Sequence, residues 1–165
     1  MIEQDLFHLL ALQRVEGVGD IMAKKLLTLF GNAESVFKAK ASQLTAIDGV
    51  GSVLIKNLKD KSVFEKANQE LDFIQKNEIN VAYFQDENYP ERLKHCIDGP
   101  VLLFTSGNID LKNKKIISIV GTRQITSYGI EFCRKLMEDI APLNPIIVSG
   151  FAYGVDIVAH QLAIE

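Results

Sequence analysis

The stretch that decides the fold runs from Ile116 to His160 and reads IISIVGTRQITSYGIEFCRKLMEDIAPLNPIIVSGFAYGVDIVAH. Two short apolar runs, Ile116–Val120 and Ile146–Val148, flank the segment Ile130–Leu143, whose apolar residues recur at helical spacing. A strand, a helix and a second strand in this order predict a right-handed crossover unit with parallel strands. The stretch therefore predicts an α/β fold with a parallel sheet.

Each predicted strand runs into a loop that contains glycine. Gly121-Thr122-Arg123 follows the first strand, and Ser149–Asp156 follows the second. Ligands of open parallel sheets bind at the carboxyl ends of the strands, and backbone N–H groups, hydroxyls and an arginine suit phosphate oxygens. Adjacent strands would place the two loops side by side, so we expect a polyanion site there. The predicted contact residues are Gly121, Thr122, Arg123, Ser149, Gly150 and Gly154.

Other glycine-loop and catalytic patterns fit these loops poorly. The spacings G-x-G-x-x-G and G-x-x-x-x-G-K-[ST] are absent, which argues against a dinucleotide site or a P-loop. Ser149, Asp156 and His160 invite comparison with a hydrolytic triad, but no G-x-S-x-G motif surrounds Ser149. We expect Asp156 and His160 to structure the loop and the following helix, and we expect no catalytic and no metal-binding residues.

Two aromatic residues, Phe151 and Tyr153, alternate with small residues in the second loop. One interpretation is that one or both stack on nucleic-acid bases, because every base offers an aromatic face. The other is that they pack the loop against the rest of the domain. The sequence leaves both open.

The first half of the chain contains an internal repeat. Val15–Gly19 and Ile47–Gly51 share the pattern apolar, acidic, Gly, Val, Gly, and each is followed by a helical pattern. The repeat predicts a tandem helix-hairpin-helix (SAM-like) domain, in which glycines admit a close ligand and helix N-termini attract phosphate. The possible secondary DNA-binding residues are Gly17, Gly19, Gly49, Gly51, Lys24 and Lys56.

Charge argues against a strongly basic face on this half. Nine basic and eight acidic residues occur between Met1 and Lys66, and a nucleic-acid interface normally concentrates positive charge. Asp20 also stands where a phosphate would approach the first hairpin. A protein-docking or spacer role is the rival interpretation.

The pattern changes near Asn77 from helical spacing to short apolar runs, which include Ile79–Phe84 and Val101–Thr105. We therefore predict a helical domain over residues 1–77 and a Rossmann-like domain with a partial parallel sheet over residues 78–165. A doubly wound sheet cannot bury both faces with so few strands, so we expect this second domain to be truncated at its C-terminal end.

Composition limits the remaining possibilities. The 165 residues carry a net charge of −3, so any positive potential must be local. Cys96 and Cys133 have no metal-binding spacing and predict reduced, packed thiols. The N-terminus is acidic where a signal peptide is basic, and no apolar run approaches the roughly 20 residues that cross a bilayer. We expect a cytoplasmic protein with no membrane partner and no cofactor.

Several blocks together resemble the DprA (Smf) family of DNA-processing proteins. The blocks are similar to the family's L-L-x-x-F-G, Y-P-x-x-L, D-x-P-x-x-L-[FY], I-V-G-[ST]-R, Y-G, V-S-G-x-A-x-G-x-D and A-H patterns. They are Leu26–Gly31, Tyr89–Lys94, Asp98–Phe104, Ile119–Arg123, Tyr128-Gly129, Val148–Asp156 and Ala159-His160.

The resemblance implies a DNA-binding protein without enzymatic turnover. Members of this family bind single-stranded DNA on a Rossmann-like sheet, form dimers, and load the RecA recombinase onto incoming strands in natural transformation. It implies that Gly121 and Arg123 contact DNA phosphate, helped by Ser149, Gly150 and Gly154. The implied partners are single-stranded DNA, RecA and, in the full-length protein, a second copy. The alternatives are an enzyme or sensor for a nucleotide-like small molecule, and a protein-interaction adaptor.

Overall fold

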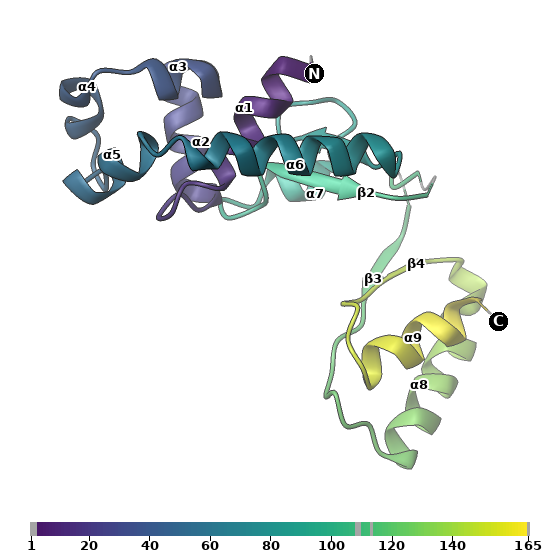
Figure 1. Ribbon diagram of the computed structural model, residues 1–165. Coiled ribbons are helices and arrows are strands. Elements are labelled where there is room, and N and C mark those ends of the chain that lie inside the picture. Colours follow the sequence, from purple (N-terminus) through teal and green to yellow (C-terminus); the bar gives the residue numbers. More distant parts are fainter. Residues whose placement is uncertain (1–2, 108–109, 113, 165) are drawn as a thin grey trace. The chain divides into compact units, whose positions relative to one another are not determined.

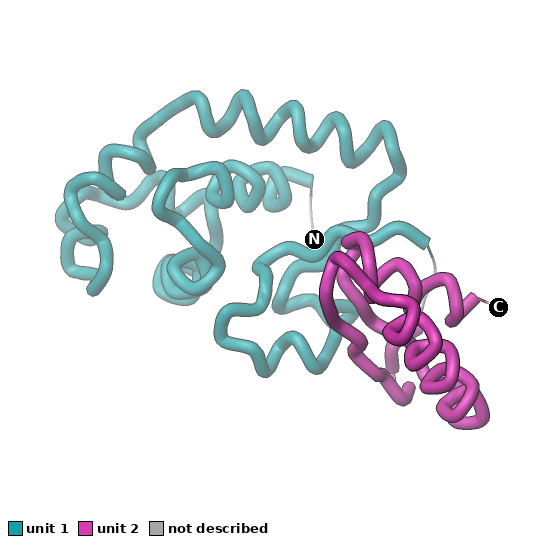
Figure 2. Tube along the Cα trace, turned by 90° about the horizontal axis from the view of Figure 1, so that it is seen from below, with its two compact units in different colours: residues 1–108 teal, residues 109–165 magenta. Residues whose placement is uncertain are grey.

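The computed structural model describes residues 3–107, 110–112 and 114–164, which form two compact units (Figures 1 and 2). Unit 1 comprises residues 1–108 and unit 2 comprises residues 109–165. The α/β class predicted from the sequence is confirmed, because helices combine with an antiparallel strand pair in unit 1 and a parallel pair in unit 2.

Unit 1 is mainly helical. Helices α1 (Glu3–Gln13) and α6 (Ser62–Lys76) pack against each other, and α3 (Ala33–Lys38) packs against both α1 and α2 (Asp20–Phe30) (Figure 1). Fully buried leucine and valine side chains from these helices form one apolar core, which includes Leu10, Leu26 and Val36. The elements are α1 (Glu3–Gln13), α2 (Asp20–Phe30), α3 (Ala33–Lys38), α4 (Ala41–Thr45), α5 (Ser52–Leu58), α6 (Ser62–Lys76), β1 (Asn80–Tyr83), α7 (Glu91–Lys94) and β2 (Leu102–Thr105).

The strands β1 and β2 belong to unit 1 and pair antiparallel, with Asn80 opposite Thr105 and Tyr83 opposite Leu102. Val101 and Leu102 are buried in the same apolar core as the helices. The compact units therefore divide about thirty residues later than the change in sequence pattern, because this strand pair buries its apolar residues against the helices rather than joining the parallel sheet.

The internal repeat forms two helix–turn–helix units that contact each other reciprocally. A Cβ on Gly49 would lie 2.9 Å from Met22, and a Cβ on Gly17 would lie 3.4 Å from Leu54, the repeat equivalent of Met22. Both glycines have positive φ, +89° at Gly17 and +87° at Gly49, which L-residues rarely adopt.

Polar contacts follow the same symmetry. The Lys25 ammonium donates to the Asp48 carbonyl oxygen, and the Asn57 amide donates to the Glu16 carbonyl oxygen at 3.0 Å. Asn57 is the repeat equivalent of Lys25, and Asp48 is that of Glu16. Each turn is thus held by a side chain from the helix of the other repeat.

Unit 2 contains the predicted strand–helix–strand unit. Strands β3 (Ile116–Ser118) and β4 (Ile146–Val148) pair parallel and in register, and α8 (Ser127–Ile140) with the 3₁₀ turn η1 (Ala141–Leu143) connects them. The helix α9 (Val155–Ile164) packs on α8 and on β4. The prediction of parallel strands is confirmed.

The ends of these elements differ slightly from the predicted ones. Helix α8 begins three residues before Ile130, because the Thr126 hydroxyl caps it by accepting from the Gly129 N–H at 3.1 Å. Strand β3 ends at Ser118, although the Ile119 N–H still donates to the Val148 carbonyl oxygen at 2.9 Å.

Both cysteines are free thiols, but only one is packed. Cys133 lies in the core of unit 2 on α8, as predicted. Cys96 is exposed, which corrects the expectation of two packed thiols: it follows the short helix α7, and its Sγ contacts the Arg92 carbonyl oxygen at 3.7 Å. Among the helices of the described residues, none has the length and apolar character needed to cross a membrane.

Candidate functional site

The first glycine loop leaves β3 at the carboxyl end of the strand. The Thr122 hydroxyl oxygen accepts from the Gln124 N–H at 3.1 Å, which closes a tight turn. Gly121 lies against α9, since a Cβ there would stand 2.5 Å from a methyl carbon of Val155. Within the described part of the chain the exposed Arg123 side chain has no ion-pair or hydrogen-bond partner, so its guanidinium can accept an anion.

The second glycine loop follows β4 and is fastened at several points. The Ser149 hydroxyl donates to the Ile119 carbonyl oxygen at 2.6 Å, so its proton is already engaged within the sheet. The Nε2–H of His160 on α9 donates to the Gly150 carbonyl oxygen at 3.1 Å. These bonds hold the start of the loop to β3 on one side and to α9 on the other.

The two loops touch each other through their backbones. The Val155 N–H donates to the Thr122 carbonyl oxygen at 3.1 Å. At Gly154, with φ of +84°, a Cβ would lie 2.2 Å from the Thr122 carbonyl oxygen and 2.6 Å from the Arg123 carbonyl carbon. The structure thus brings together the predicted residues Gly121, Thr122, Arg123 and Gly154 at one edge of the sheet.

Asp156 and His160 occupy the first turns of α9. Asp156 is 8% exposed, and its carboxylate lies beside the second loop, since a Cβ on Gly150 would stand 2.5 Å from Asp156 Oδ2. The hydroxyl of Ser149 and the ring of His160 both bond to backbone carbonyls rather than to each other. The arrangement holds the loop and does not form a nucleophile–base pair.

The possible secondary residues in unit 1 have varied surroundings. Gly19 and Gly51 precede α2 and α5 and have open space where a Cβ would be. The Lys24 side chain is engaged within unit 1, because its ammonium donates to the carbonyl oxygens of Cys96 and Ile97 at 3.2 Å each. It also lies 5.5 Å from the Phe84 ring centroid. Lys56 on α5 is exposed.

Asp20 makes a structural hydrogen bond that the sequence analysis did not predict. Its carboxylate accepts from the Val101 N–H at 2.8 Å, and Val101 is 1% exposed. The residue therefore fastens the start of β2 to the start of α2. No local sequence signal points to this contact, because the partners are far apart along the chain.

Unit 1 also has an acidic cavity of about 230 Å³ that the sequence did not predict. Its lining includes the carboxylates of Asp5, Glu34 and Asp86. Burial raises the pKa of Tyr83, which also lines the cavity, and the nearby Asp86 and Asp5 carboxylates add to this increase. Such a lining repels phosphate.

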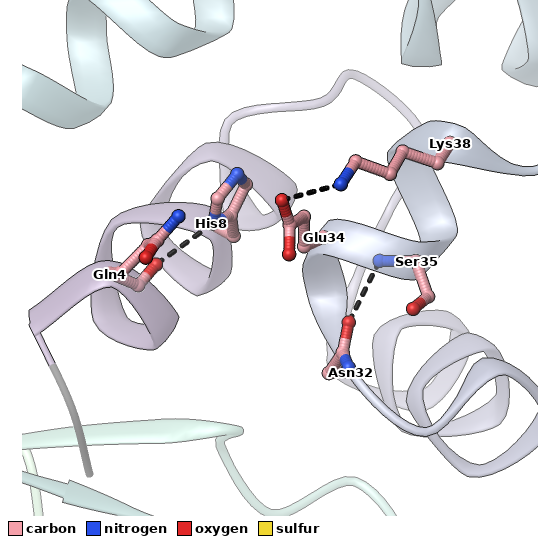
Figure 3. A network of polar contacts seen from close by, with 6 residues as sticks. All are labelled: Gln4, His8, Asn32, Glu34, Ser35 and Lys38. Atoms are coloured by element: carbon pink, nitrogen blue, oxygen red, sulfur yellow. Dashed lines mark hydrogen bonds and ion pairs between the residues drawn. The ribbon is translucent and has the colours of Figure 1, made fainter.

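The polar side chains beside the cavity are mostly engaged in local contacts (Figure 3). The His8 ring donates to the Gln4 carbonyl oxygen at 2.8 Å, and Lys38 forms an ion pair with Glu34 at 2.7 Å, which lowers the Glu34 pKa. No group of three or more His, Cys, Asp and Glu side chains among the described residues could hold a metal ion.

Comparison with known proteins shows which family this chain is related to. The family model described as DNA recombination-mediator protein A matches residues 80–165. The chain is 28% identical over 169 residues to Protein Smf from Synechocystis, covering 98% of this chain and 42% of that protein. It is 28% identical over 151 residues to the DNA processing protein DprA of Bacillus subtilis, covering 90% of this chain and 50% of that protein.

A solved structure supports the same fold. The X-ray structure of DNA processing protein A from Streptococcus pneumoniae matches with a TM-score of 0.60 and 23% identity, over 99% of this chain and 54% of that one. The chain thus spans about half the length of the curated relatives that it matches. Because the family model covers more than half of the sequence and the relatives cover nearly all of it, the chain belongs to the DprA/Smf family of DNA recombination-mediator proteins.

Proposed function

We propose that the paired glycine loops of unit 2 bind the phosphate backbone of single-stranded DNA, as part of a recombination mediator that has no turnover of its own. The observation that carries the proposal is the contact of Gly154 with the backbone of Thr122 and Arg123. This contact holds an exposed arginine and two glycine turns in one place, at the carboxyl ends of two parallel strands.

The loop residues take different roles in this proposal. Arg123 supplies the charge and the planar donor set for phosphate oxygens. Gly121, Gly150 and Gly154 face Val155, Asp156 and the Thr122 backbone, so the absence of their side chains lets the two loops pack closely. This packing holds main-chain N–H groups beside Arg123, where they and Thr122 would contact phosphate.

Three further residues support the loops. Ser149, whose hydroxyl proton is given to Ile119, positions the second loop instead of donating to DNA. Asp156 and His160 hold that loop on α9.

The proposal for the whole protein follows from its relatives. Two of them carry the name DNA processing protein DprA, and the family model carries the words recombination mediator. We infer that the complete protein protects incoming single-stranded DNA, loads RecA onto it during transformation, and acts as a homodimer. The glycine-loop edge would be its DNA-contacting part.

Fluorescence anisotropy of a labelled oligo-dT tests the proposal. We expect tight binding that weakens as salt rises, because phosphate contacts release counterions. We also expect this binding to survive competition by duplex DNA. Arg123→Ala should weaken binding at least about tenfold, which corresponds to roughly 1.4 kcal/mol. Arg134→Ala is the matched control, since Arg134 is an exposed arginine on α8, outside both loops.

An unaffected Arg123→Ala variant, or equal affinity for duplex and single strand, would overturn the assignment. The same titration with a mononucleotide separates the rival function. Saturable binding of the mononucleotide at least as tight as that of the oligonucleotide would favour a small-molecule enzyme or sensor.

A further inference from the structure

Two aromatic side chains stand exposed in the second glycine loop, next to the proposed phosphate site. Phe151 is fully exposed, and Tyr153 is 79% exposed. The nearest ring contact of Phe151 is with His160, at 6.4 Å between centroids and a tilt of 51°, which covers neither face of the phenyl ring. Loop packing, one of the two interpretations of the sequence, therefore does not account for these side chains.

The loop that carries these rings is itself held firmly. Ser149 bonds to Ile119, the Gly150 carbonyl accepts from His160, and Val155 donates to Thr122. Because the backbone is fastened on both sides of them, the two rings project from a fixed base. A ring on a fixed base loses little conformational freedom when a flat ligand stacks on it.

The position of Tyr153 connects the rings to the phosphate site. Its neighbour Gly154 lies in direct contact with the backbone of Thr122 and Arg123. A DNA strand whose phosphate lies at Arg123 would therefore carry its adjacent bases past the loop with Phe151 and Tyr153. Proteins that bind single-stranded nucleic acids typically combine positive charge along the phosphate backbone with aromatic side chains on which the bases stack.

We propose that Phe151, with Tyr153 beside it, forms a base-stacking platform that makes the glycine-loop site selective for unpaired bases. The inference rests on the proposed function, because it needs the strand to lie on the Arg123 loop. Bases in a duplex are stacked on each other and offer no free face to the two rings. Selectivity for single strands thus comes from the rings, and affinity for the backbone comes from Arg123.

Two oligonucleotides of equal length separate these contributions, namely labelled oligo-dT and an abasic strand with the same number of phosphates. Phe151→Ala should weaken oligo-dT binding about fivefold to tenfold, within the range found for loss of one base–aromatic stack, and leave the abasic strand unaffected. Arg123→Ala should weaken both. Phe151→Trp should retain oligo-dT binding, since the indole also stacks.

The control is Phe132→Ala, which removes a half-exposed aromatic ring from α8, outside the loop, and should change neither affinity. Circular dichroism of every variant checks that the fold is kept. If Phe151→Ala weakens both strands equally, or neither, the stacking platform is wrong while the effect of Arg123→Ala still supports the DNA site. If the wild-type chain binds neither strand, the proposed function itself fails.

Discussion

Gly154 lies so close to Thr122 that a Cβ at position 154 would stand 2.2 Å from the Thr122 carbonyl oxygen. The obstacle is backbone, so rotation of a side chain cannot relieve it. Gly154 also has φ of +84°, a conformation that costs an L-residue about 1–2 kcal/mol. The contact between the two loops of the site therefore depends on the absence of one side chain.

Gly154→Ala should separate the two loops. We expect local stability of unit 2 to fall by about 2 kcal/mol or more, because backbone strain adds to the steric overlap. Hydrogen exchange measured by mass spectrometry on peptides from β3 to α9 reports this loss. Gly31→Ala in unit 1, followed in the peptides that span α2 and α3, is the control: its φ is also +84° but nothing lies within 4 Å of the added carbon, so only the conformational cost applies. Equal losses in the two variants would show that the loop contact contributes nothing.

The parts of the fold that were predicted correctly depend on patterns within about thirty residues. The alternation of apolar runs and a helical segment predicted β3, α8 and β4. The glycines after the strands predicted two loops at one edge of the sheet, and the role of these loops as a binding site stays a prediction. Contacts between distant residues were not predicted. Sequence patterns report which face of an element is apolar, but not which distant element covers that face, so the attachment of β1 and β2 to the helices was missed.

The Asp20 carboxylate exemplifies such a contact and supports a stability prediction. Asp20→Ala removes the acceptor of the buried Val101 N–H, and an unsatisfied buried donor costs about 1–3 kcal/mol. We expect unfolding by denaturant, followed by circular dichroism, to show a loss of about 2 kcal/mol. Asp20→Asn should lose less, since its amide oxygen can still accept.

Glu16→Ala supplies the comparison for Asp20. Glu16 is an exposed acid in the same turn, and it contributes only its backbone carbonyl, to Asn57. Surface substitutions of this kind change stability by less than about 0.5 kcal/mol. If Asp20→Ala and Glu16→Ala behaved alike, the bond from Val101 would have no energetic importance.

The raised pKa of Tyr89 predicts that the folded protein loses stability at alkaline pH. Burial raises the pKa of its hydroxyl above the usual value of 10.0, and the nearby Asp20 and Cys96 add to the increase. The unfolded chain therefore ionises first as pH rises, so the stabilisation is complete below pH 10 and is lost as pH climbs through the raised pKa.

Tyr89→Phe isolates this effect. The variant lacks the hydroxyl that donates to the Pro100 carbonyl oxygen at 2.6 Å, so it should be about 1 kcal/mol less stable at pH 8. The difference should shrink above pH 10, where only the wild type gains free energy by ionising Tyr89 in the unfolded state. Denaturant unfolding at several pH values measures both curves. Tyr83, whose pKa is also raised, is present in both proteins and cancels. Parallel curves up to pH 11 would contradict the prediction.

Substitution of Lys24 and of Lys56 tests which lysines of the helical half stabilise the fold and which contact DNA. Lys24 is engaged with the Cys96 and Ile97 carbonyls and with the Phe84 ring, so Lys24→Ala should lower the stability of unit 1 by about 1 kcal/mol and leave oligo-dT affinity unchanged. Lys56 is exposed on α5, so Lys56→Ala should leave stability unchanged.

Anisotropy at several salt concentrations then decides whether the helical half contacts DNA. If it does, Lys56→Ala should weaken binding and reduce the salt slope by about 1, since one phosphate contact is lost. An unchanged slope would favour protein docking, in agreement with the near balance of basic and acidic residues in this half. A loss of DNA affinity in Lys24→Ala at unchanged stability would contradict the structural role of Lys24, because an ammonium held by two carbonyls of its own unit has few donors left for phosphate.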